Sequence, residues 1–106
     1  MITIRYKCDE AHELKISGHA GYAEKGKDIV CAGVSAITYA LLGIIDADYI
    51  SRRIADGNVY IRCENNSERI GTAFDMAIIG YEQIAHTHPD NVSVQILPQQ
   101  AADSGE

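Results

Sequence analysis

The chain has 106 residues, of which 46% are hydrophobic and 23% charged, and it carries a net charge of −6. Such a length and composition predict one globular domain. No apolar run reaches the roughly 18 residues that a membrane-spanning helix needs. The negative charge disfavours direct non-specific binding to nucleic acid, because such binding relies on Lys and Arg at the phosphates.

The first residues and the cysteines indicate the cellular compartment. The chain begins with an alternating, strand-like pattern and lacks the layout of a signal peptide. Its three cysteines, Cys8, Cys31 and Cys63, cannot all pair within one chain, and they form no CxxC motif. Reduced thiols in a cytoplasmic protein fit this pattern better than disulfides or a zinc site do.

Short stretches with alternating or apolar patterns predict strands along the chain. They cover residues 2–7, 13–17, 49–54, 59–63 and 92–96. The first two stretches are close enough to form a hairpin, whose second strand ends at Gly18. The pair Asp56-Gly57 is a strong signal for a second hairpin between the third and fourth stretches.

Two longer stretches repeat apolar residues at the spacing of an amphipathic helix. The first runs from Val30 to Ile44 and is expected to end near Asp46. Asp28, just before it, is the expected cap or first-turn acid.

The second helical stretch runs from Ile70 to Ala85. Asn65 followed by Glu68 is the expected capping box at its start. Pro89 stops the helix, because proline cannot continue it.

The order of these elements, ββαββαβ, predicts the fold class. We expect an α+β fold with two helices packed on one face of a five-stranded, mostly antiparallel sheet. The single domain is expected to cover residues 1–98. Residues 99–106 are polar and acidic, and we expect them to be a disordered tail.

The stretch from Gly18 to Ser35 carries the candidate chemistry. Cys31 falls at the predicted start of a helix, where unpaired N–H groups and the helix dipole favour a thiolate. His19 stands at the other end of the intervening loop, and an imidazole near the thiol would complete a nucleophile pair. Taken alone, Cys31 also fits a small buried thiol, and His19 fits a histidine bonded to the backbone at a strand end.

Other residues in this stretch have candidate supporting roles. Asp28 either orients His19 or the loop, or serves only as a helix cap. Ser35 lies one helical turn beyond Cys31, where it either bonds near the thiol or bonds back to a helix carbonyl. The expected loop-shaping or substrate-binding positions are Gly18, Gly21, Tyr22 and Gly26.

Two motifs in this stretch resemble the ribosomal-processing cysteine protease family. They are the run Gly18-His19-Ala20-Gly21-Tyr22-Ala23, and the run Asp28-Ile29-Val30-Cys31-Ala32 followed by Val34-Ser35. The resemblance extends over roughly Met1 to Leu97 in the order and size of the elements. It implies a cysteine endopeptidase that removes a short N-terminal extension from a bacterial large-subunit ribosomal protein. Cys31 would be its nucleophile and His19 its general acid and base. It also implies a homodimer.

Two other classes of function stay open at this point. One is a non-catalytic module that binds a ribosomal protein or assists ribosome assembly. The other is a redox-sensing protein that uses the Cys31 thiol. No cofactor or metal is expected, because Cys8 and Cys63 match no catalytic motif and His86 with His88 supplies too few ligands.

Overall fold

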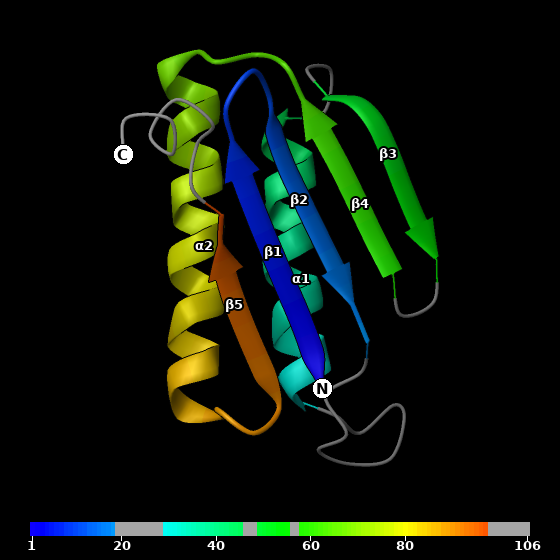
Figure 1. Cartoon of the computed structure of the whole chain (residues 1–106), viewed down its shortest axis with the longest axis vertical. Coiled ribbons are helices and arrows are strands. Elements are labelled where there is room, and N and C mark those ends of the chain that lie inside the picture. The colour runs from blue at the N-terminus through cyan, green and yellow to red at the C-terminus, as the bar shows by residue number, and fades with distance from the viewer. Residues whose placement is uncertain (19–28, 46–48, 56–57, 98–106) are drawn as a thin grey trace.

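The structure is a computed structural model that describes residues 1–18, 29–45, 49–55 and 58–97. It is a small α+β domain with two helices, as the sequence predicts (Figure 1). In chain order the elements are β1 (Ile2–Cys8), β2 (His12–Ser17), α1 (Ile29–Ile45), β3 (Tyr49–Ala55), β4 (Asn58–Cys63), α2 (Glu68–Thr87) and β5 (Val92–Ile96). The predicted tail, residues 99–106, lies outside the described residues.

The strands form one sheet in the order β3-β4-β2-β1-β5. The pairs β1–β2, β2–β4 and β3–β4 are antiparallel, whereas β5 lies parallel to β1 at the sheet edge. Ala55 pairs with Asn58, so the predicted second hairpin is present, although its turn residues Asp56 and Gly57 lie outside the described residues. The first hairpin brings Cys8 opposite His12.

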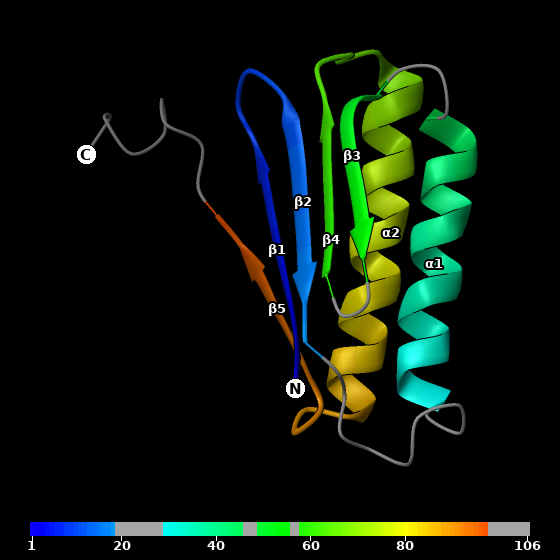
Figure 2. The same cartoon turned by 90° about the vertical axis from the view of Figure 1, so that its right-hand side faces the viewer.

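Both helices lie on the same face of the sheet (Figure 2). Side chains from alternating strand positions, among them Ile4, Leu14 and Ile61, are fully buried in the core. From α2, Phe74 and Tyr81 are fully buried in the same core. Burying one such side chain contributes about 1.5–3 kcal/mol to folding, so this layer between helices and sheet is the main source of stability.

The start of α2 differs from the sequence prediction. The N-cap is Ser67, whose side chain accepts a hydrogen bond from the Ile70 N–H, so the predicted capping box of Asn65 and Glu68 is wrong. Asn65 instead accepts a bond from the Ser67 N–H through its side-chain oxygen, at 2.8 Å. Glu68 becomes the first residue of the helix, where its negative charge complements the dipole. The helix ends at Thr87, two residues before Pro89, as predicted.

Glycines and one arginine fix how α1 and α2 lie together. A Cβ on Gly80 of α2 would come 2.8 Å from the Ile37 side chain of α1, and one on Gly33 of α1 would come 3.2 Å from Ile84. The absence of these carbons therefore permits the close approach of the helices. Arg69 of α2 donates a 2.6 Å bond to the Ile44 carbonyl in the last turn of α1. It thus satisfies a carbonyl of a helix end that has no basic residue of its own.

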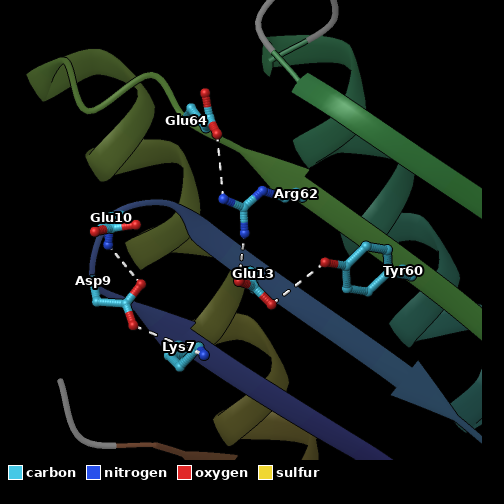
Figure 3. Close-up of polar contacts among 7 residues, drawn as sticks. All are labelled: Lys7, Asp9, Glu10, Glu13, Tyr60, Arg62 and Glu64. Carbon is cyan, nitrogen blue, oxygen red and sulfur yellow. Dashed lines mark hydrogen bonds and ion pairs between the residues drawn. The ribbon is translucent and has the colours of Figure 1, made fainter. Parts of the chain in front are cut away.

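A polar network lies across strands β2 and β4 (Figure 3). Arg62 donates to Glu13 at 2.7 Å and to Glu64 at 3.2 Å, and Tyr60 donates a longer bond to Glu13 at 3.4 Å. The hydrogen bond to Glu64 and the two carboxylates raise the pKa of Arg62. Arg62 and Glu13 are half-buried and Glu64 is exposed, so we assign the network to the sheet surface and give it little weight in stability.

Candidate active site

Two elements that flank or carry the candidate chemistry, β2 and α1, meet at one end of the domain. β2 ends and α1 begins at this same end (Figures 1 and 2). The Gly18 and Ile29 positions that flank the intervening segment therefore belong to one region of the molecule. His19, Gly21, Tyr22, Gly26 and Asp28 lie within residues 19–28, outside the described residues.

Cys31 lies in the first turn of α1, which begins at Ile29. This confirms the predicted position of the thiol at a helix start. The side chain is partly buried and packs against the hydrophobic core, and it forms no disulfide. No acidic residue occurs in this first turn. The dipole at the helix start therefore favours a thiolate at Cys31, without opposition from a carboxylate of the same turn.

Gly18, the last described residue before His19, has a backbone conformation and surroundings that suit only glycine. It has a φ of +92°, a conformation that L side chains rarely adopt. A Cβ at this position would also clash with the backbone carbonyl oxygen of Met1. Both observations require glycine here, and the loop-shaping role of Gly18 stays a prediction.

Gly33 and Ser35 follow Cys31 on α1. Ser35 is exposed one turn beyond the thiol. Its place on the helix agrees with the prediction, and its proposed bond near the thiol stays a prediction. Gly33 lies against Ile84 of α2, so the turn that carries Cys31 is backed by the second helix.

The other cysteines lie away from the start of α1. Cys8 ends β1 and Cys63 ends β4, at the end of the sheet where the chain turns from β1 into β2. Within residues 1–18, 29–45, 49–55 and 58–97, no three His, Cys, Asp or Glu side chains gather in a way that could hold a metal ion. No helix in the same ranges is long and apolar enough to cross a membrane.

The arrangement at Cys31 can support nucleophilic chemistry. A thiol in the first turn of a helix has backbone N–H groups beside it that can also stabilise a negatively charged oxygen. Attack of such a thiolate on a peptide carbonyl would place the new oxyanion near these donors. The remaining requirement is a group that moves protons, and His19 next to Gly18 is the sequence candidate for it.

Comparison with known proteins gives consistent sequence matches. A sequence model of the family described as "Cysteine protease Prp" matches residues 1–93. The ribosomal processing cysteine protease Prp of Mycoplasma pneumoniae is 31% identical over 87 residues, which cover 79% of this chain and 86% of that protein. The protein of the same name from Mycoplasma genitalium is 28% identical over 83 residues, covering 76% and 84%.

Solved structures share the fold. The ribosomal processing protease Prp from S. aureus, in complex with a covalently linked product peptide, superposes with a TM-score of 0.83 at 23% identity, covering 92% of this chain and 100% of that one. The same protease with a substrate peptide gives 0.77 at 22% identity, with the same coverage. SMU.848 from Streptococcus mutans gives 0.74 at 23%, covering 94% and 96%. Together with the family match over residues 1–93, these likenesses show that the chain belongs to the cysteine protease Prp family.

Proposed function

We propose that this cysteine protease removes a short N-terminal extension from a bacterial large-subunit ribosomal protein. The observation that carries the proposal is the position of Cys31 in the first turn of α1 in a chain of this family. The names of the Mycoplasma relatives and the peptide complexes of the S. aureus protease support a peptide substrate of this class. The three cysteines without disulfides fit action in the reducing cytoplasm.

The proposed mechanism proceeds through an acyl-enzyme. The Cys31 thiolate attacks the carbonyl carbon of the scissile bond, and N–H groups of the first turn of α1 stabilise the oxyanion. His19, in its protonated form, gives a proton to the leaving amine, and the C–N bond breaks. His19 then takes a proton from water, which attacks the thioester and releases Cys31 as thiolate.

Supporting residues complete the proposed site. Asp28 orients His19 or the segment that carries it, and Ser35 bonds near the thiol from the following turn. The proposed loop and substrate-binding positions are Gly18, Gly21, Tyr22 and Gly26. These residues and the dyad fall within the proposed protease domain, residues 1–98.

We also propose that the protein is a homodimer joined through the outer face of its two helices. α1 has no charged side chain along its 17 residues. Tyr39 of α1 is 60% exposed, and Met76 and Ile79 of α2 are 50% and 58% exposed. Met76 also lines a shallow apolar hollow of about 450 Å³ beside Ile44. Exposed apolar surface of this kind favours association.

The dimer has a direct test by sedimentation. Ile79→Glu should convert the protein to a monomer at micromolar concentration. Ile96→Glu, at an equally exposed apolar position on β5, is the matched control and should stay dimeric. A wild-type monomer under these conditions would refute the dimer, and loss of the dimer in Ile96→Glu alone would move the interface to the sheet edge.

Peptide cleavage tests the protease proposal against the other two classes. Cys31→Ala and His19→Ala should each abolish cleavage of a peptide that spans the extension. A wild-type rate in Cys31→Ala would refute the mechanism. Tight binding of the peptide by wild-type protein without cleavage would favour the binding module. Reversible oxidation of Cys31 with no cleavage and no effect of His19→Ala would favour the redox sensor.

A further inference from the structure

His12 is a buried histidine that the proposed mechanism does not use. It is the first residue of β2 and is only 5% exposed. Its ring stacks on the fully buried ring of Phe74 in α2, with the ring centroids 4.5 Å apart and the planes at 5°. The β1–β2 turn beside it lies at the opposite end of the sheet from the start of α1 (Figure 1).

One hydrogen bond links this imidazole to a neighbouring phenol. The Nδ1 atom of His12 lies 2.7 Å from the phenolic oxygen of Tyr6 in β1. Burial raises the pKa of Tyr6, so its phenol keeps its proton throughout the neutral range. A protonated phenol can donate this bond, and where it does, Nδ1 accepts and the neutral imidazole carries its proton on Nε2.

The groups that face His12 offer little support for a positive charge. Among the described residues, its titratable neighbours are Tyr6 and Cys8 from β1, Cys63 from β4 and Asp75 from α2. Burial lowers the pKa of His12, and the exposed carboxylate of Asp75 opposes that shift only in part. Phe74 occupies one face of the ring, so no water replaces the lost solvation there.

We propose that His12 makes this end of the domain sensitive to acid, because it keeps the β1–β2 end of the sheet packed against α2 only while its imidazole is neutral. Protonation of Nδ1 would set two hydrogens against each other between His12 and Tyr6. The phenol would then have to turn its proton away, and a cation would sit within the core. This device does not depend on the proposed protease function.

The sign of the pH effect follows from proton uptake. The unfolded chain binds a proton at His12 near the ordinary pKa of about 6.5, whereas the folded chain resists it. Below that pH the unfolded state holds more protons, so stability falls as the pH falls. The folding equilibrium constant should drop by up to about tenfold per pH unit, until the depressed pKa of the folded state is reached.

Urea unfolding of the full chain at pH 7.5 to 5.5 measures this loss. The double variant Tyr6→Phe/His12→Phe keeps both aromatic rings, removes both hydrogen-bonding groups and should lose the pH dependence in this range. His86→Gln, at an exposed position in the last turn of α2, is the control and should retain it. Equal pH dependence in the wild type and the double variant would overturn the proposal.

Nitrogen NMR of the wild-type histidines provides a second test that requires no variant. His12 should show the tautomer with its proton on Nε2 at pH 7.5, and it should titrate below the ordinary histidine pKa of about 6.5. Titration of His12 at or above an ordinary histidine pKa would overturn the proposal, and so would a protonated Nδ1 at pH 7.5.

Discussion

The hydroxyl oxygen of Thr38 in α1 lies 2.6 Å from the phenolic oxygen of Tyr81 in α2. Thr38 also lies 2.8 Å from the Val34 carbonyl, to which it donates its only hydroxyl proton. Tyr81 is therefore the donor in the bond between the helices. Burial raises the pKa of Tyr81 to about 12, which keeps this donor protonated. A polar contact inside the core thus joins α1, the helix that carries Cys31, to α2.

Thr38→Val should destabilise the protein by about 1–3 kcal/mol, because it leaves the buried Tyr81 hydroxyl without its acceptor. The double variant Thr38→Val/Tyr81→Phe removes both polar groups and should recover part of this loss. Urea unfolding measures both free energies. A double variant less stable than Thr38→Val alone would show that the bond does not account for the cost.

Ser67→Ala should cost about 1 kcal/mol of stability, because it removes the N-cap of α2. Glu68→Gln is the control, since it tests the residue on which the predicted capping box depended. Its expected cost is smaller, because Glu68 contributes only its charge near the helix dipole. The measurement is thermal or urea unfolding. A larger loss in Glu68→Gln than in Ser67→Ala would contradict the observed cap.

Gly71 and Gly80 of α2 should respond differently to substitution by alanine, because only Gly80 lies close to another side chain, that of Ile37. Gly71→Ala should stabilise the protein by up to about 1 kcal/mol, because alanine favours helix and nothing lies within 4 Å of the Cβ that it would add. Gly80→Ala should gain less or lose stability, since Ile37 must shift. Adding Ile37→Val, which removes the contacting methyl group, should lessen that penalty. An equal gain in both single variants would show that the close approach is unimportant.

Gly18→Ala should impair both the fold and cleavage. The left-handed backbone alone costs a non-glycine residue about 1–2 kcal/mol, and the clash with the Met1 carbonyl adds to this. Because Gly18 directly precedes His19, relief of the clash would displace the proposed base. We expect lower stability by urea unfolding, together with a lower kcat in the folded protein. A variant with unchanged stability would contradict the observed backbone at Gly18.

Much of the fold follows from local patterns in the sequence. The helical spacing from Val30 to Ile44 predicted α1 within a residue or two, and with it the place of Cys31. The strand order was not predictable in the same way, because alternation marks a strand but does not name its neighbours. The parallel pairing of β5 with β1 depends on contacts between the two ends of the chain.

The N-cap of α2 and the burial of His12 show where local patterns were insufficient. Asn65 and Ser67 both suit an N-cap, and only the distance to the first buried residue, Ile70, distinguishes them in retrospect. His12, directly before the predicted strand 13–17, carries no functional signal in the sequence. Its burial depends on Phe74, which comes from a distant helix. The dyad itself rests on the motifs and the family, because His19 lies outside the described residues.

The central claim is that Cys31 cuts a ribosomal-protein precursor at one bond, with His19 as its partner. The most direct measurement incubates the purified protein with the precursor from the same organism and follows the precursor N-terminus by mass spectrometry. We predict a single cut near the N-terminus, which is lost in Cys31→Ala and His19→Ala and retained in Cys8→Ser. An intact precursor with the wild-type protein, or the same cut with Cys31→Ala, would contradict the account.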